Sequence, residues 1–188
     1  MTDDGVLVHR CLAGDQAALR AFVERFQGPV FGLCYRMLRH RHDAEDTAQE
    51  VFLRAFRGLS RWKTGRPLEP WLMTIAANRC RTALRRRRNR PVAAPAAADA
   101  AALAGPSGAD DLAEELERAL GRLREEYRQC FILFHHAELS CARIGQVMGR
   151  PAGTIKTWLH RARRELADRL KRRGIVREDR HELQRLRT

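Results

Sequence analysis

Hydroxyl, cationic and histidine side chains recur at helical spacing between residues 151 and 166. Long cations neutralise DNA phosphates, whereas short hydroxyls and forked donors form hydrogen bonds with base edges in the major groove. A helix that gathers both kinds of group on one side is therefore suited to recognising duplex DNA. The candidate DNA-contacting residues are Thr154, Lys156, Thr157, His160, Arg161 and Arg164.

Two short helices joined by a tight turn would present that surface. Ser140 can cap a first helix, and Gly149 offers the left-handed residue that ends it. Pro151 suits the first position of a second helix because it needs no amide partner. The inward positions are Ile144, Val147, Met148, Ile155, Leu159, Ala162 and Leu166. We predict a helix-turn-helix that binds DNA; an ordinary helical hairpin with a basic outer face is the alternative.

A second polar face lies on a helix expected over about residues 70–88. Its apolar residues fall on one side, and an aromatic ring, amide and hydroxyl groups, and cations gather on the other. Such a face can stack on, hydrogen-bond to and neutralise an unpaired nucleic acid strand. It comprises Trp71, Thr74, Asn78, Arg81, Thr82 and Arg85. The alternatives are that Trp71 packs into the core and that residues 85–88 are only a non-specific phosphate clamp.

The segment before this helix, residues 58–70, is expected to be a loop because Gly65, Pro67 and Pro70 interrupt it. Cations and an aromatic ring occur within it, and we expect these side chains to be exposed. They extend the set of candidate nucleic-acid contacts by Arg61, Trp62, Lys63 and Arg66.

An acidic patch stands out on the helix expected over residues 43–59. Ala48, Val51, Phe52, Ala55 and Leu59 form its apolar stripe. On another face lie Asp46, Gln49 and Glu50, at spacings of three and four residues. Acidic residues in a first helical turn are ordinary partners of the helix dipole, which is the simpler explanation. A patch deeper in the helix of a basic chain would instead suit docking on a basic protein surface.

The formal charge of +13 is unevenly distributed over the 188 residues. Residues 61–90 contain ten basic residues and one acidic residue, and residues 121–188 contain seventeen and eight. Between them, residues 91–120 contain one basic residue and six acidic residues. Two basic blocks separated by an acidic interval indicate two contacts with one polyanion.

Several functional classes find no support in the sequence. The five cysteines have no close pair and are expected to be small apolar core residues, and the histidines lack companion ligands, so we expect no metal and no cofactor. We also find no apolar run long enough to span a bilayer and no signal-peptide pattern at the start. The expectation is a cytoplasmic protein without membrane insertion.

The chain is expected to be all-α, with two small helical domains and a flexible linker. In the first domain, residues 5–90, Asp15 can cap a helix that follows Gly14, and Gly28 with Pro29 is expected to break it again. Residues 91–110 are rich in alanine, proline and glycine, and extend at most about 66 Å as a linker. The second domain, residues 111–172, adds helices over 111–123 and 125–138 to the helix-turn-helix. A charged tail is expected over 173–188.

Three segments in this order resemble the extracytoplasmic-function (ECF) sigma factors of bacterial RNA polymerase, within the sigma-70 superfamily. They are D-A-E-D-T-A-Q-E-V-F-L-R-A from residue 43, P-W-L-M-T-I-A-A-N-R-C from residue 70, and the stretch 139–166. The resemblance covers nearly everything except the linker and about the last fifteen residues. The three motifs together are highly specific.

The resemblance implies a role for each surface. The first domain would bind the clamp helices of the polymerase β′ subunit through Asp46, Gln49 and Glu50. It would also open the minus-ten promoter element, with Asn78 beside a flipped-out base and the loop 60–69 helping to enclose that base. The second domain would read the minus-thirty-five element, with Lys156, Thr157, His160 and Arg161 at the matching contact positions.

The same resemblance implies several partners and no catalysis by this chain. Its partners would be the core polymerase, including the β subunit, promoter DNA and an anti-sigma factor, and the polymerase would perform the chemistry. The chain departs from the family at Cys141-Ala142-Arg143, where an aromatic residue and two acids are usual, and at Trp158, where arginine is common. The alternative function is a stand-alone helix-turn-helix transcriptional regulator.

Overall fold

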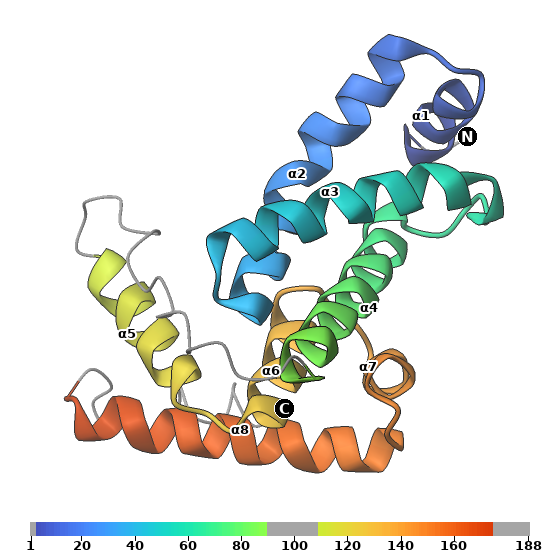
Figure 1. Ribbon diagram of the computed structural model, residues 1–188. Coiled ribbons are helices and arrows are strands. Elements are labelled where there is room, and N and C mark those ends of the chain that lie inside the picture. Colours follow the sequence, from blue (N-terminus) through green and yellow to red (C-terminus); the bar gives the residue numbers. More distant parts are fainter. Residues whose placement is uncertain (1–2, 90–108, 175–188) are drawn as a thin grey trace. The chain divides into compact units, whose positions relative to one another are not determined.

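The computed structural model describes residues 3–89 and 109–174, and these residues form helices without any strand (Figure 1). They belong to two compact units, one built mainly from residues before position 99 and one mainly from residues after position 100. The all-α prediction with two small helical units is therefore confirmed. Most of the expected linker and tail, residues 91–108 and 175–188, lies outside the described residues.

The first unit is built from α1 (Asp3–Leu12), α2 (Gln16–Leu38), α3 (Arg41–Gly58), a short 3-10 helix η1 (Leu59–Arg61) and α4 (Leu68–Asn89). Helices α2, α3 and α4 each pack against the other two, and α1 lies beside the first half of α2 (Figure 1). Phe22 of α2 contacts the rings of Phe26, Phe52 and Phe56, which joins α2 to α3 in the core. This core fixes the outer faces of α3 and α4.

Helix α2 begins as predicted but continues where a break was predicted. The carboxylate of Asp15 accepts hydrogen bonds from the backbone N–H groups of Ala17 and Ala18, which confirms it as the N-cap. The prediction of a break at Gly28 and Pro29 is wrong, because α2 runs through both residues to Leu38. Proline inside a helix costs about 3 kcal/mol. Burial of the flanking Phe26, Val30 and Leu33 at about 1.5–3 kcal/mol for each side chain outweighs that cost.

Helix α4 begins two residues before the predicted Pro70 because a distant side chain caps it. The carboxylate of Asp4 accepts a hydrogen bond of 3.0 Å from the backbone N–H of Leu68, 64 positions away. It also forms an ion pair of 2.8 Å with Arg25 of α2. Asp4 thus connects α1 to the first turn of α4 and to α2, a connection that local sequence patterns do not reveal.

Asp4→Ala is expected to lower the free energy of unfolding by about 1–2 kcal/mol, because it leaves a helix N–H without its acceptor. Urea unfolding followed by circular dichroism measures this change. Asp3→Ala is the matched control, since the Asp3 side chain is 97% exposed and lies 3.6 Å from the same arginine. Equal effects of the two substitutions would contradict a capping role for Asp4.

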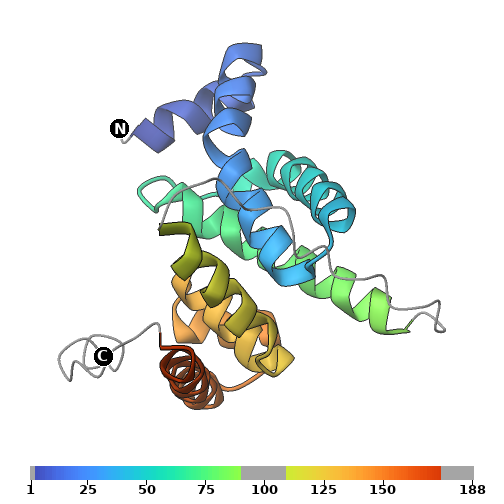
Figure 2. The same cartoon turned by 90° about the vertical axis from the view of Figure 1, so that its left-hand side faces the viewer.

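The second unit is built from α5 (Ala109–Gly121), α6 (Glu125–His135), α7 (Cys141–Met148) and α8 (Ala152–Arg172). Helix α8 contacts the other three, with α7 near its start and α5 near its end (Figure 1). Figure 2 shows α8 nearly end-on beside α5 and α6. Part of the core consists of Leu120, Leu123, Tyr127, Ala162 and Leu166, with Trp158 and Leu170 packed against it.

The predicted helix-turn-helix is present as α7 and α8. The Ser140 hydroxyl accepts a hydrogen bond from the backbone N–H of Arg143, and Gly149 has a φ of 63° at the end of α7. Both predicted caps are thereby confirmed. Pro151 is the N-cap residue of α8, so the helix begins one residue later than predicted. Its φ of −59° still suits the turn into the helix.

The cysteines are free thiols, and four of the five are buried as predicted. Cys141 is half-buried. The sulfur atoms of Cys34 and Cys80 lie 3.6 Å apart between α2 and α4, and their hydrogen bond together with burial raises the pKa of Cys80 well above its ordinary value. A thiol held in its protonated form in this way packs as an apolar side chain.

Candidate functional site

The acidic patch lies on the outer face of α3. Asp46 and Gln49 are exposed, and the Asp46 carboxylate lies 3.1 Å from the imidazole of His42 one turn earlier. Leu53 is 57% exposed on the same face, although a large apolar side chain gains free energy when it is buried. We name Asp46, Gln49, Glu50 and Leu53 the α3 face. Acidic and apolar groups side by side favour contact with another protein over simple solvation.

Leu53 was missed in the sequence analysis, which assigned only polar residues to this patch. The available signal was its position outside the apolar stripe of the helix, three residues after Glu50 and four after Gln49. A leucine at such a position has no place in the core of its own unit. It is therefore a candidate for burial against a partner.

Glu50 differs from the rest of the α3 face because it has a structural partner. Its half-exposed carboxylate forms an ion pair with Arg79 of α4, whose side chain is only 12% exposed. The Nε atom of Arg79 is buried without a hydrogen-bond partner within the described residues. Removing Glu50 would leave a mostly buried cation without its counter-ion, which is costly. Glu50 thus stabilises the packing of α3 on α4, whatever else it contacts.

The polar face of α4 is exposed at its centre and half-buried at its first turn. Asn78 and Arg85 are exposed, whereas Trp71, Thr74 and Arg81 are half-buried. The Thr74 hydroxyl donates to the carbonyl oxygen of Pro70 at 2.8 Å, so it can only accept further hydrogen bonds. Asn78 keeps both its amide donors and its side-chain carbonyl at the surface. Among these residues it is the one best able to read the edge of an unpaired base.

Trp71 is neither a core residue nor fully exposed. It lies close to the end of α3, since a Cβ atom on Gly58 would be 3.8 Å from its ring. Its half-buried ring leaves part of its surface open to solvent. An aromatic ring held in this way loses little conformational entropy when a base stacks on it.

The loop before α4 differs from prediction at one residue. Arg61, Lys63 and Arg66 are exposed as expected, but Trp62 is 7% exposed, so the prediction of an exposed ring there is wrong. Trp62 directly follows η1, its backbone N–H bonds the carbonyl of the buried Leu59, and α1 packs against η1. Trp62 anchors the loop from within and leaves its cations at the surface.

The outer face of α8 carries the predicted DNA-contacting residues on its first four turns. Lys156, Thr157, His160, Arg161 and Arg164 are exposed and Thr154 is half-buried. The Thr157 hydroxyl donates to the carbonyl oxygen of Gly153 at 3.1 Å, which fixes its rotamer. Cations and oriented hydroxyls on a protruding helix match the requirements for major-groove binding.

Arg161 has a positioning partner that sequence reasoning missed. Its Nη1 atom donates to the phenolic oxygen of Tyr127 on α6 at 3.1 Å. This hydrogen bond raises the pKa of the Arg161 guanidinium above its ordinary value. The two residues are 34 positions apart, and no local pattern connects them.

Comparison with known proteins gives the family. The family descriptions Sigma-70 region 2 and Sigma-70, region 4 match residues 22–90 and 113–166. The ECF RNA polymerase sigma factor SigW of Bacillus subtilis (strain 168) is 32% identical over 177 residues, which cover 84% of this chain and 91% of SigW. The chain belongs to the ECF RNA polymerase sigma factors.

Two solved structures share the fold of this ECF sigma factor. CnrH, in complex with the cytosolic domain of CnrY, aligns with a TM-score of 0.60 at 22% identity, over 88% of this chain and 96% of CnrH. RpoE of Bartonella quintana, in complex with the anti-sigma factor NepR, aligns with a TM-score of 0.59 at 22% identity. That alignment covers 81% of this chain and 98% of RpoE. The matches to both sigma-70 regions and to SigW confirm the sigma-factor prediction from three sequence motifs, and this family is one of transcription initiation factors rather than an enzyme class.

Trp158, noted above as an expected departure from the family, is part of a cluster of an arginine and two tilted aromatic rings. Its ring lies 6.3 Å from that of Tyr127, and the guanidinium of Arg150 lies 5.9 Å from the centre of the indole. A cation over an indole is a favourable contact. Tyr127 also connects this cluster to Arg161 on the outer face of α8 through the hydrogen bond described above.

Two kinds of feature are absent from the part of the sigma factor that the structure describes. Within residues 3–89 and 109–174, no group of histidine, cysteine or acidic residues is arranged to hold a metal ion. Over the same ranges, each helix is too short or too polar to cross a bilayer.

Proposed function

We propose that this sigma factor binds core RNA polymerase through the α3 face, opens the minus-ten element with α4 and reads the minus-thirty-five element with α8. The observation that carries the proposal is Leu53, which is exposed beside Asp46, Gln49 and Glu50 on a helix whose other side packs against α2 and α4. A regulator that acts through DNA alone has no use for such a surface. We assign the domains to residues 5–90 and 111–172, joined by the linker 91–110.

On this proposal, the strand-opening surface consists of the α4 face and the loop before it. Asn78 captures an extruded base, Trp71 offers a ring for stacking, and Thr74 accepts a hydrogen bond. Extruding a base costs a few kcal/mol of unstacking, and these contacts offset that cost. Cations around them hold the phosphates of the opened strand: Arg61, Lys63, Arg81 and Arg85.

The duplex-reading surface is the start of α8. Lys156, Arg161 and Arg164 bind phosphates or guanine edges, and Thr154, Thr157 and His160 contact bases. Neither domain has to bind tightly alone, because the linker gives the second contact a high effective concentration once the first has formed. The chain itself catalyses no reaction on this proposal, and it acts in the cytoplasm, where the polymerase and its template are found.

Run-off transcription from a promoter library tests the proposal directly. Core polymerase is assayed with and without the protein, and the new transcript starts are mapped. We expect discrete starts that depend on the protein. If no start depends on it, while the free protein binds duplex DNA specifically, the chain acts as a stand-alone regulator and the proposal fails.

Asn78→Ala is expected to reduce promoter opening about 10- to 100-fold, which corresponds to the loss of about 1–3 kcal/mol of base recognition. Fluorescence of 2-aminopurine in the minus-ten element measures the opening. Binding of a short duplex with only the minus-thirty-five element serves as the control and is expected to stay unchanged. Normal opening by the variant would remove Asn78 from the proposed strand-opening surface.

An anti-sigma factor is a further proposed partner. RpoE of Bartonella quintana, which shares the fold, was solved in complex with the anti-sigma factor NepR. A protein that covers the α3 face would prevent polymerase binding through simple occlusion. Competition between core polymerase and a purified anti-sigma factor for the chain tests this partner, and simultaneous binding of both would contradict occlusion.

A further inference from the structure

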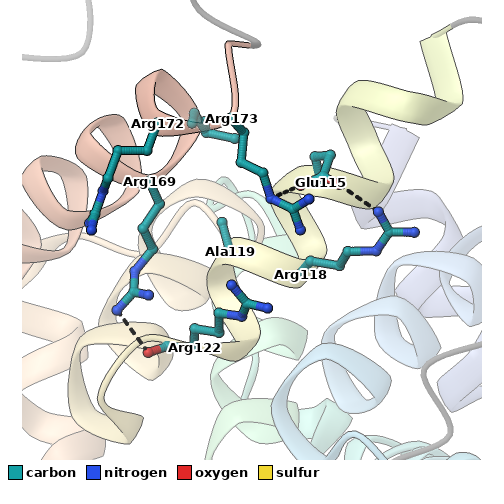
Figure 3. Close-up of a pocket in the computed structure, with 8 residues that line it drawn as sticks. Glu115, Arg118, Ala119, Arg122, Arg169, Arg172 and Arg173 are labelled. Carbon is teal, nitrogen blue, oxygen red and sulfur yellow. Dashed lines mark hydrogen bonds and ion pairs between the residues drawn. The ribbon is translucent and has the colours of Figure 1, made fainter.

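A strongly basic pocket of 260 Å³ lies between α5 and the last turns of α8 (Figure 3). It has no place in the proposed sigma-factor surfaces. Five arginines and a single glutamate account for all its charged lining. The lining residues are Glu115, Arg118, Ala119, Arg122, Arg169, Leu170, Arg172 and Arg173.

The one carboxylate is already shared between two of these arginines. Glu115, whose side chain is 15% exposed, forms ion pairs with Arg118 and, at 3.3 Å, with Arg173 (Figure 3). Glu165, outside the lining, adds a second carboxylate 3.6 Å from Arg169. Two negative charges do not balance five guanidinium groups. Clustered like charges repel, so an anion that enters the pocket gains from the field that the protein has already assembled.

Donors remain for such an anion. The Nε atom of Arg169 is buried and has no hydrogen-bond partner within the described segments, while its Nη2 atom donates to the carbonyl oxygen of Arg122 at 3.2 Å. The guanidinium of Arg122 is exposed and makes no ion pair with any described residue. The Nε atom of Arg172 donates a hydrogen bond to the backbone carbonyl oxygen of Asp168. Its terminal nitrogens are left for a ligand.

The pocket is separate from the proposed DNA-contacting residues on the outer face of α8. Arg164, the last proposed DNA-contacting residue of α8, and Arg169, the first pocket residue on that helix, are five residues apart, which corresponds to about 7.5 Å along the helix axis and about 140° around it. The pocket also lies along the junction of the two helices, since Arg173 pairs with Glu115 of α5 and Arg169 bonds the carbonyl of Arg122 just after α5. DNA held by the first turns of α8 would therefore leave the pocket open.

We propose that this pocket binds an oligophosphate group, as found in inorganic pyrophosphate or triphosphate and in nucleoside di- and triphosphates. Planar guanidinium groups form paired hydrogen bonds with phosphate oxygens, and several converging arginines suit several linked phosphates. The volume is below the range of about 300–1,000 Å³ typical of pockets that enclose drug-sized ligands. The pocket accordingly holds the phosphate chain, with any nucleoside outside. The bound group bridges α5 and α8 and so stabilises the second unit.

Isothermal titration calorimetry of the full chain with inorganic triphosphate in 0.15 M salt tests the proposal. We expect one site, with orthophosphate binding at least tenfold more weakly. Parallel titrations with pyrophosphate and with GTP or ATP distinguish the source: tighter nucleotide binding indicates a nucleotide, and tighter inorganic binding a free oligophosphate. Absence of triphosphate binding up to 1 mM, or equal binding of orthophosphate, would overturn the proposal.

Arg122→Gln with Arg172→Gln is expected to weaken triphosphate binding at least tenfold. Both residues lie outside the Glu115 ion pairs, and an unchanged thermal midpoint without ligand will show that the fold is kept. The matched control is Arg86→Gln with Arg88→Gln, which removes the same charge from exposed positions of α4 and should leave binding unchanged. An equal loss in both variants would indicate non-specific attraction. Displacement of triphosphate by a minus-thirty-five duplex would place the pocket on the DNA surface; either result contradicts the proposal.

Discussion

Asp46→Arg with Gln49→Arg is expected to weaken binding of core RNA polymerase at least a hundredfold, or by about 2.7 kcal/mol. The α3 face presents an acid, an amide and a leucine, and we infer that its partner surface is basic with an apolar centre. Two arginines on that face would meet like charges at short range, which costs several kcal/mol in an interface. Titration of labelled sigma factor with core polymerase, followed by fluorescence anisotropy, measures the change.

The choice of positions follows from the structure. Replacing Glu50 by arginine, instead of Gln49, would place the new cation beside the poorly exposed Arg79, with which Glu50 pairs. A loss of polymerase binding could then reflect damage to the packing of α3 on α4. Among the residues that the structure describes, Asp46 pairs with the exposed His42 alone, so its replacement leaves the core untouched.

Helix α2 offers a closely matched control. Glu24 and Gln27 are exposed. Like Asp46 and Gln49, they are an acid and an amide three residues apart, and the acid is longer by one methylene group. Glu24→Arg with Gln27→Arg is expected to leave polymerase binding within about twofold, because rim or remote charges contribute little. Equal weakening by both pairs of substitutions would show that net charge alone accounts for the loss of binding. It would also contradict the α3 face as the proposed interface.

Gly145→Ala is expected to destabilise the second unit by about 2–3 kcal/mol and to abolish binding of the minus-thirty-five duplex at 37 °C. A Cβ atom on Gly145 would lie 2.6 Å from the carbonyl oxygen of Arg150 and 3.5 Å from the backbone nitrogen of Ala152. Both neighbours are backbone atoms of the turn between α7 and α8, so they cannot rotate away. The carbonyl oxygen of Gly145 also accepts hydrogen bonds from Gly149 and Arg150, which ties the turn to this position.

Gly153→Ala is the matched control for this substitution. Gly153 lies in the first turn of α8, and a Cβ atom there would meet nothing within 4 Å. Because alanine favours the helix, we expect a gain of about 0.5–1 kcal/mol in the free energy of unfolding. Thermal unfolding of the two variants compares a crowded helical glycine with an open one. Similar melting temperatures would show that the α7–α8 turn can relax.

Much of the fold was accessible from the sequence because helix signals are local. The apolar stripes, the caps at Asp15 and Ser140 and the left-handed Gly149 each depend on residues within one or two turns. The same locality identified the faces of α3, α4 and α8, since residues three or four positions apart share a side of a helix. Two helical units followed from these patterns, and the sigma-factor family from the resemblance of three ordered segments to its known members.

The errors and omissions concern contacts between residues far apart in the chain. Helix α2 continues through Pro29 because the residues on either side are buried by other helices. The start of α4 depends on a carboxylate of α1, and the buried Trp62 directly follows the 3-10 helix η1, against which α1 packs. None of these effects changes the periodicity of the local sequence, so no pattern of spacing could report them.

The sequence by itself determined which helix faces are polar, acidic or basic, because side-chain type and helical period suffice for that. Only the tertiary structure decided how those side chains are used. It turned Trp62 inward, committed Glu50 to Arg79, oriented Arg161 through Tyr127 and gathered five arginines from α5 and α8 around one pocket. Each outcome depends on which helices pack together, since packing brings groups from distant positions within hydrogen-bond or Coulomb range.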